Sequence, residues 1–211
     1  MEPIRAVIFD LGRVLVGLDL KRGLFGRLAR LAAAEGADPV TGAYADSLYV
    51  DYATGRIPPA EFHRRLCART GLELDFEQFV AAWCDVFVEL PGMQPLLEQV
   101  AARLPVGLLS DTDPLHWAHL RRRLPWLKRI AQPCLSYELG ALKPEPTCYR
   151  AAARSVGQPA AACLFIDDLE RNVQGARAAG MQALRFEDAQ VLRRRLEQGG
   201  VLVAGDEERP R

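Results

Sequence analysis

The segment Ala6-Val7-Ile8-Phe9-Asp10-Leu11-Gly12 is the strongest indication of fold in this chain. Its run of apolar residues, followed directly by an aspartate, is typical of a parallel strand that is buried on both faces. Later stretches repeat this pattern, the last of them more mixed and expected near a sheet edge: residues 106–109, 134–135, 163–166 and 182–186. Helical periodicity separates these stretches, as in residues 171–179. Alternating strands and helices predict the α/β class, with a doubly wound, Rossmann-like parallel sheet.

The stretch from residue 17 to residue 90 interrupts this alternation. It contains no convincing strand, and its apolar residues recur at helical spacing. Pro58-Pro59 is typical of a helix start, because proline is favoured in the first turn. We therefore predict a small helical domain over residues 17–90, inserted after the first strand of a core domain formed by residues 1–16 and 91–205. Residues 206–211 are expected to form a flexible tail.

The composition excludes several classes of protein. The 211 residues include 27 basic and 27 acidic side chains, so no field of one sign would attract nucleic acid or an anionic membrane. The five cysteines contain no Cys-X-X-Cys pair, which favours buried thiols in a reducing compartment over disulfides or a zinc site. The sequence contains no run approaching the roughly 18 apolar residues of a membrane span, and no signal-peptide core precedes Asp10. We expect a cytoplasmic protein that binds neither nucleic acid nor membranes.

Polar side chains follow the predicted strands at their carboxyl ends, which is where doubly wound sheets bind ligands. Asp10 ends the first strand, Ser110-Asp111 the second, and Asp167-Asp168 the strand at residues 163–166, while Lys143 lies between the last two in sequence. Carboxylates that converge would repel one another unless a cation lay among them. A small set of oxygen ligands suits Mg²⁺, which keeps several waters and is completed by a substrate phosphate.

Four segments, taken in order, resemble the four motifs of the haloacid dehalogenase-like hydrolase superfamily. They are Phe9–Leu15, Leu109–Asp111, Leu142–Pro144 and Phe165–Asp168. The set spans nearly the whole chain and is much more specific than any one motif. Two further segments, around Gly55-Arg56-Ile57-Pro58 and Asn172-Val173-Gln174-Gly175, are similar to the branch with a small helical cap domain after the first motif. Its opening is similar to that of α-glucose-1-phosphate phosphatases and of the phosphatase domain of soluble epoxide hydrolases.

The resemblance implies a phosphatase that acts on a small phosphorylated metabolite, such as a sugar phosphate. Asp10 would attack phosphorus and form an aspartyl-phosphate. Lys143 would balance the charge on Asp10 and on the transferring phosphoryl group. Ser110 and the backbone N–H groups that follow it, beginning at Asp111, would bind the phosphoryl oxygens. We expect a small phosphate ester as the partner and a monomer or homodimer as the assembly.

The resemblance also implies a set of Mg²⁺ ligands. They would be a carboxylate oxygen of Asp10, the backbone carbonyl of Gly12 and the carboxylate of Asp168, with Asp167 nearby or acting through water. The metal would screen the charge between nucleophile and phosphate and polarise the phosphoryl oxygens. Asn172 is a candidate supporting residue of this site.

Two positions depart from the pattern of the superfamily. Most of its phosphatases carry an aspartate at the position of Gly12, as general acid and base, and such a group contributes a rate factor of about 10² to 10⁴. Asp19, on the chain that leaves the first motif, is a candidate substitute. Asp111 stands where asparagine is usual, and its charge is unfavourable beside a phosphate unless the side chain points away, is protonated or pairs with an arginine.

Other interpretations stay open at this level. A 2-haloacid dehalogenase would use the same aspartate without metal, and a mutase would return the phosphoryl group to its substrate. A catalytically weak relative would bind a phosphorylated ligand or a partner. Asp10 could instead cap a turn, and Asp167-Asp168 could cap the following helix. His116 and His119, one helical turn apart, are interpreted as surface or packing residues.

Overall fold

The computed structural model describes residues 2–34 and 47–203, and the predicted tail at residues 206–211 lies outside them. A parallel sheet forms the core, in the order β5-β4-β1-β6-β7. Its strands are β1 (Ala6–Phe9), β4 (Val106–Ser110), β5 (Cys134–Leu135), β6 (Cys163–Asp167) and β7 (Gln182–Arg185). All the strands predicted from the apolar runs are confirmed, and the mixed run forms β7 at an edge of the sheet. The chain winds outward from β1 in both directions, which is the doubly wound topology.

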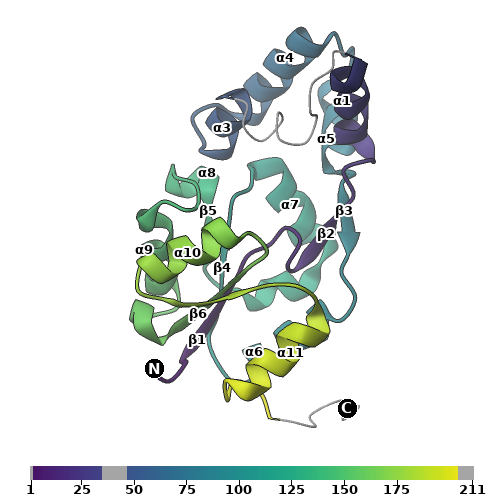
Figure 1. Ribbon diagram of the computed structural model, residues 1–211. Helices are drawn as coiled ribbons and strands as arrows, with labels where there is room; N and C mark the ends of the chain where they lie inside the picture. Colours follow the sequence, from purple (N-terminus) through teal and green to yellow (C-terminus); the bar gives the residue numbers. More distant parts are fainter. Residues whose placement is uncertain (1, 35–46, 204–211) are drawn as a thin grey trace.

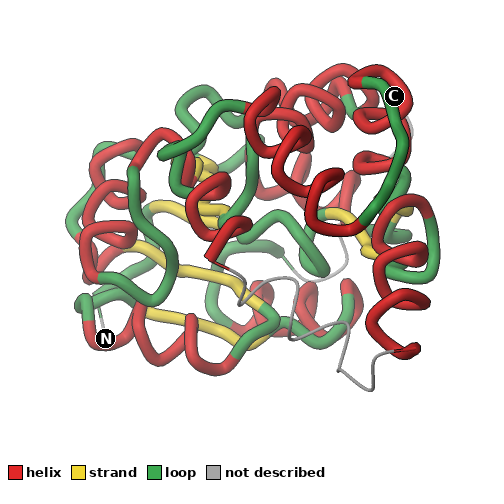
Figure 2. The backbone as a smooth tube through the Cα atoms, turned by 90° about the horizontal axis from the view of Figure 1, so that it is seen from above, coloured by secondary structure: helices red, strands yellow, loops and turns green. Residues whose placement is uncertain are grey.

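Helices cover both faces of this sheet, as Figures 1 and 2 show. The helices of the core are α6 (Met93–Ala101), α7 (Pro114–Arg123), α8 (Ser136–Leu139), α9 (Pro146–Ser155), α10 (Glu170–Ala178) and α11 (Ala189–Gln198), with short 3₁₀ turns η1 (Pro125–Arg129) and η2 (Ala160–Ala162). Alternate residues of β1 point to opposite faces, because side chains alternate along a strand. Ala6 and Ile8 lie in one apolar cluster with α9 and α10, and Val7 and Phe9 lie in another with α6 and α11. A continuous apolar run is needed because both faces are buried.

A group of helices lies at the carboxyl end of the sheet, above it in Figure 1. These helices are α1 (Gly23–Ala34), α3 (Ser47–Ala53), α4 (Pro59–Thr70) and α5 (Phe76–Cys84), and we call this group the cap. α4 begins at Pro59, as the Pro58-Pro59 pair predicts. Stacked and edge-on rings fill the interior of the cap, with the rings of Tyr52 and Phe62 stacked at 4.2 Å between centroids. The helical spacing of its apolar residues is therefore explained by an aromatic core of its own.

The expectation that residues 17–90 contain no strand is wrong. β2 (Val16–Leu18) and β3 (Phe87–Glu89) pair antiparallel where the chain enters and leaves the cap. Each strand has only three residues, which is too short for a periodicity that could be recognised in the sequence. Their pairing becomes favourable only when the two ends of the inserted segment meet.

The cap also contacts the core away from the pair of strands β2 and β3, which we call the ribbon. Gly55, at the end of α3, has φ 72°, and a Cβ there would lie 2.2 Å from the backbone oxygen of Tyr137 in α8. A side chain at position 55 could not fit unless the turn after α3 and the helix α8 moved apart. α5 packs on α7 at the opposite side of the cap.

Two findings bear on the expectations from composition. All five cysteines are free, and all except Cys67 are buried. None of the helices within the described ranges combines the length and the hydrophobicity that a transmembrane span requires.

Candidate active site

The carboxyl ends of the central strands bring most of the predicted site residues to one cavity of about 710 Å³. It is bounded by these strand ends, by the cap and by the ribbon. The predicted residues that line it are Asp10, Gly12, Ser110, Asp111, Lys143, Asp168 and Asn172. Asp167 lies directly behind Lys143 and contacts its ammonium group. The strands β4 and β6 both pair with β1, so residues far apart in sequence converge at one edge of the sheet.

A tight turn after Asp10 shapes one wall of the cavity. The carbonyl of Leu11 accepts hydrogen bonds from the N–H groups of Leu15 (2.9 Å) and Val16 (3.0 Å). Arg13 has φ 61°, which is uncommon outside glycine, and its N–H donates to the Val16 carbonyl at 2.6 Å. A Cβ at Gly12 would meet the side chain of Leu18 no closer than 3.5 Å. Space alone therefore does not require a glycine at position 12.

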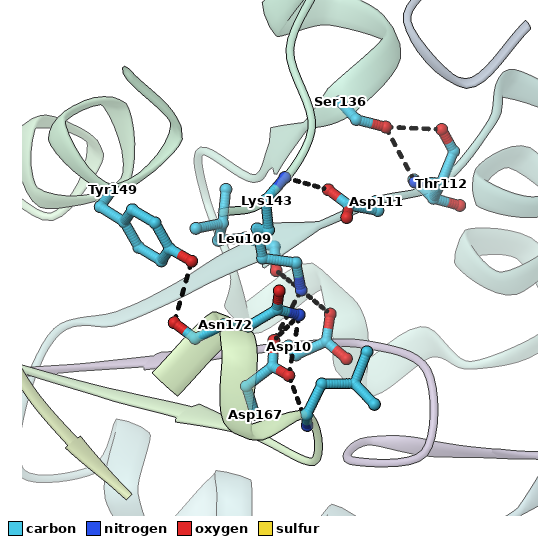
Figure 3. Close-up of polar contacts among 10 residues, drawn as sticks. Asp10, Leu109, Asp111, Thr112, Ser136, Lys143, Tyr149, Asp167 and Asn172 are labelled. Carbon is cyan, nitrogen blue, oxygen red and sulfur yellow. Dashed lines mark hydrogen bonds and ion pairs between the residues drawn. The ribbon is translucent and has the colours of Figure 1, made fainter. Parts of the chain in front are cut away.

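Lys143 is the charged centre of the site, and its side chain is almost completely buried. Its Nζ donates to Asp10 Oδ1 at 2.6 Å, to Asp167 Oδ2 at 2.8 Å and to the Leu109 carbonyl at 3.3 Å (Figure 3). An ammonium group has three donors, and these acceptors match them in number. Lys143 therefore links three strands of the sheet through a single buried charge.

Burial and neighbouring charges shift the titration of these groups in opposite ways. Burial has the largest effect on Asp10 and raises its pKa to about 7, while the Lys143 ammonium lowers it and Asp167 raises it further. Burial alone would lower the pKa of Lys143, but Asp10, Asp167 and Asp111 raise it above its ordinary value. Burial also raises the pKa of Asp168, and the charge of Asp167 adds to that rise. The site therefore holds more negative charge than its lysine neutralises.

Asp167 and Asp168 are adjacent in sequence but have different environments. Asp167 is fully buried, and both of its carboxylate oxygens are engaged: the Asn172 amide donates to each (3.0 and 3.1 Å), and the Leu169 N–H donates to Oδ1 at 2.9 Å. Asp168 lines the cavity, and the guanidinium of Arg13 approaches its Oδ2 at 3.9 Å. Asp167 thus fixes Lys143, whereas Asp168 is presented to a ligand.

The donor set fits a hard divalent cation. One carboxylate oxygen each from Asp10, Asp167 and Asp168 lies within 4.8 Å of the others. Oδ1 of Asn172 is buried and, among the described residues, has no hydrogen-bond partner. An all-oxygen site with excess negative charge is the chemistry that Mg²⁺ prefers. Asp10 and Asp168 could hold the ion, with the backbone of Gly12 at the same cavity.

The loop after β4 departs from the expectation for its backbone N–H groups. The N–H of Thr112 donates to Oγ of Ser136 at 2.9 Å, and the same hydroxyl donates back to the Thr112 carbonyl at 2.9 Å. That N–H group is therefore already used and is not left for a phosphate. Ser110 is buried at the end of β4 and lines the cavity, as predicted.

The side chain of Asp111 is directed to the lysine loop. Its Oδ1 accepts the backbone N–H of Lys143 at 3.0 Å, as Figure 3 shows. Burial raises the pKa of this carboxyl, and the charge of Lys143 lowers it. The unusual aspartate thus links the loop after β4 to the loop that carries Lys143.

Asp19 does not join this group. Its Oδ1 accepts the N–H of Lys21 at 3.0 Å, and its own N–H donates to Val86, so it shapes the entry to the cap instead of lining the cavity. Sequence reasoning missed other residues of the cavity wall, among them Tyr49, Phe87 and His116. His116 is a packing residue, as interpreted, but it also faces the cavity. These residues can be recognised as part of the cavity wall only once the packing of the cap on the core is known.

A doubly wound sheet whose strand ends bring together three aspartates and a buried lysine, under an inserted helical cap, defines a class of α/β hydrolases. The chain belongs to the haloacid dehalogenase-like hydrolase family, because the model of that family matches residues 4–180.

Known proteins are similar to this chain over most of its length. The phosphatase MT3486 of Mycobacterium tuberculosis is 31% identical over 85% of this chain and 86% of its own. The D-ribitol-5-phosphate phosphatase of Bacteroides thetaiotaomicron is 25% identical over 88% of this chain and 93% of its own. A crystal structure of a haloacid dehalogenase family enzyme from the same organism, in complex with magnesium and inorganic phosphate, has a TM-score of 0.73 at 26% identity, with 88% and 95% of the two chains covered.

Proposed function

We propose that this protein is a Mg²⁺-dependent phosphatase that hydrolyses a small phosphorylated metabolite through an aspartyl-phosphate. The observation that carries the proposal is the Asp10 carboxylate, which lines the cavity with its Oδ1 2.6 Å from a buried lysine and with the carboxylates of Asp167 and Asp168 close by. The phosphatases among the similar proteins, and the magnesium and phosphate in the crystal structure of a similar haloacid dehalogenase family enzyme, support it.

In this proposal, a carboxylate oxygen of Asp10 forms a bond to phosphorus while the bond from phosphorus to the ester oxygen breaks. The leaving oxygen takes a proton from water, because Gly12 supplies no acid. Ser110 and the Asp111 N–H bind the phosphoryl oxygens, and Lys143 holds the attacking carboxylate in place. Water then attacks phosphorus, which releases inorganic phosphate and restores the carboxylate. Bound Mg²⁺ supplies positive charge that offsets the repulsion between carboxylate and phosphate.

We further propose that residues 17–90 act as a cap over a core formed by residues 1–16 and 91–205, so that side chains of the cap select the leaving group. Free cysteines are typical of a reducing compartment, which supports a cytoplasmic location. We propose a monomer or a homodimer.

Removal of the metal is expected to abolish hydrolysis. With p-nitrophenyl phosphate as substrate, activity should fall to background in EDTA and return with Mg²⁺. Asp168→Asn should raise the Mg²⁺ concentration for half-maximal activity by about ten-fold or more, because a ligand loses its charge. Glu170→Gln is the matched control, since Glu170 lines the same cavity outside the aspartate cluster. The Mg²⁺ concentration that this variant needs for half-maximal activity should stay within about two-fold of the wild-type value.

The same assay separates the alternatives. Activity that persists in EDTA would contradict the proposal, and turnover of chloroacetate without metal would indicate a dehalogenase instead. No turnover across a broad panel of phosphate esters, together with tight binding of one of them, would indicate a binding protein. Ribitol phosphates and other sugar phosphates belong in the panel, because of the ribitol-phosphate phosphatase among the similar proteins.

Asp111 is expected to act through Lys143. Asp111→Ala should lower kcat by roughly ten-fold, because the Lys143 N–H loses its buried acceptor. Asp111→Asn keeps an oxygen acceptor and removes a negative charge near the phosphate, so kcat should be retained and KM should fall. Steady-state kinetics of both variants test this, and equal losses of kcat in the two would contradict the role.

A further inference from the structure

A buried hydrogen-bond network joins the cap to the core at α7. Asp113 is fully buried, and its Oδ1 accepts the N–H groups of Leu115 and His116 at 3.0 Å, which caps α7. Its Oδ2 accepts the indole N–H of Trp83 in α5 at 3.2 Å and lies 2.8 Å from Nδ1 of His116. One carboxylate therefore has partners in both the cap and the core.

His116 makes a second bond across the same boundary. Its Nε2 lies 3.0 Å from the backbone oxygen of Trp83, and its ring stacks on the Trp83 indole with 4.9 Å between centroids and 4° between planes. Carboxylate and carbonyl oxygens can only accept, so the ring of His116 is the donor in any hydrogen bond to them. Burial alone would raise the pKa of Asp113, but His116 and the Trp83 N–H lower it below its ordinary value. The contact is thus a hydrogen-bonded polar network inside an apolar interface.

The aromatic side of the cavity is built on this network. Tyr49, from α3, lines the cavity and packs on Trp83 at 6.1 Å between ring centroids. Phe87, from β3, also lines it and meets His116 edge-on at 4.8 Å. Each of these two rings therefore packs against a residue of the network.

The other end of the network reaches the phosphate side of the cavity. Asp113 follows Ser110-Asp111-Thr112 directly, and Thr112 is fixed by the pair of bonds to Ser136. Building on the proposed phosphatase function, we propose that Trp83, Asp113 and His116 are positioning residues that set the distance between the phosphate-binding loop and the aromatic wall formed by Tyr49 and Phe87. They thereby determine which leaving groups the enzyme accepts.

Two activated phosphate esters of different size test this proposal. The nitrophenyl ring of p-nitrophenyl phosphate extends several ångströms further from phosphorus than the acetyl group of acetyl phosphate does, so we expect only the larger leaving group to contact the wall. Trp83→Phe keeps an aromatic ring in the stack and removes the N–H donor, together with the same part of the indole volume that the Trp117→Phe control below removes. It should raise KM for p-nitrophenyl phosphate roughly two- to ten-fold, the range that one hydrogen bond contributes. Both kcat values, KM for acetyl phosphate and inhibition by inorganic phosphate should stay within about two-fold.

Trp117→Phe is the matched control, because Trp117 is a buried tryptophan of α7 outside the network, and it should leave both esters unchanged. Asp113→Asn keeps the Oδ1 acceptor that caps α7 and loses the second acceptor. It should therefore raise KM for p-nitrophenyl phosphate alone, as Trp83→Phe does. If Trp83→Phe does not fold, Asp113→Asn is measured in its place. Equal changes for both esters, or no change for either, would overturn the proposal. A wild-type protein that hydrolyses neither ester would instead overturn the phosphatase function itself.

Discussion

Replacement of Asp10 with asparagine is expected to lower phosphate-ester hydrolysis by about 10³-fold or more, because an amide cannot serve as the nucleophile. The side chain keeps its shape, and its oxygen can still accept from Lys143, so the fold should be retained. The measurement is kcat with p-nitrophenyl phosphate and Mg²⁺, accompanied by a melting curve. Residual activity above about 1% of wild type would contradict the assignment of Asp10 as nucleophile.

Asp19→Asn is the matched control for this variant. Asp19 lies on the same stretch of chain but does not line the cavity, so its loss should change kcat by no more than about two-fold. A much larger decrease would show that Asp19 does act as the general acid in place of Gly12. The pair of variants therefore tests Asp10 as the nucleophile and Asp19 as a candidate general acid.

The Asp10 variant should also alter the pH dependence of stability. In the folded protein burial raises the pKa of Asp10 from 3.8 to about 7, so the folded state binds this proton more tightly than the unfolded state does. The wild type therefore loses stability from this group as the pH rises from 3.8 to about 7. Asparagine removes that loss. Relative to wild type, the variant should gain stability across this range, as measured by urea unfolding in EDTA.

Replacement of Lys143 with methionine is expected to impair both catalysis and stability. The change removes the only cation, among the described residues, that donates to both Asp10 and Asp167. Removing one partner from a buried ion pair costs about 3–5 kcal/mol, which corresponds to a decrease in melting temperature of roughly 6–20 °C for a chain of this length. Hydrolysis should be lost as well, because the attacking carboxylate is no longer held in place.

The loss of stability in the Lys143→Met variant should depend on pH. The cost in the Lys143→Met variant comes from carboxylates that are charged and unpaired, so it is present at high pH and decreases as they take up protons. The pKa of Asp10 is about 7 beside the lysine and rises further without it, so the difference in stability from wild type that Asp10 causes should narrow as the pH falls toward about 7. Mg²⁺ should stabilise the variant more than the wild type, because it replaces the missing positive charge.

Lys128→Met controls for the loss of a lysine. Lys128 is exposed in η1, and its replacement should change the free energy of unfolding by no more than about 0.5 kcal/mol. A Lys143→Met variant that is as stable as this control in EDTA at pH 8 would contradict the role of Lys143 as the charged centre.

The strands of the parallel sheet and the polar residues at their ends could be predicted from the sequence. A strand buried on both faces must be apolar throughout, as Ala6–Phe9 is, and a polar residue such as Asp10 can follow only where the strand leaves the core. The same reasoning predicted Ser110 and Asp168 at the cavity. These features are local, because burial acts on each short segment separately.

Other features could not be predicted, because they depend on which segments meet. The ribbon of β2 and β3 has too few residues to show a pattern, and it forms because the ends of the cap converge. The different environments of Asp167 and Asp168 arise from Lys143 and Asn172, which lie elsewhere in the chain. Asp111 faces the Lys143 backbone for the same reason.

The α/β fold, the helical insertion and the carboxylates and lysine of the candidate site follow from the amino-acid sequence, since apolar period and residue type are properties of each segment. Contacts between distant segments determine which carboxylate faces the cavity, which oxygen accepts from the lysine and how Trp83 meets Asp113 and His116. Hydrogen bonds and ion pairs act over a few ångströms, and the folding of distant segments onto one another sets those distances.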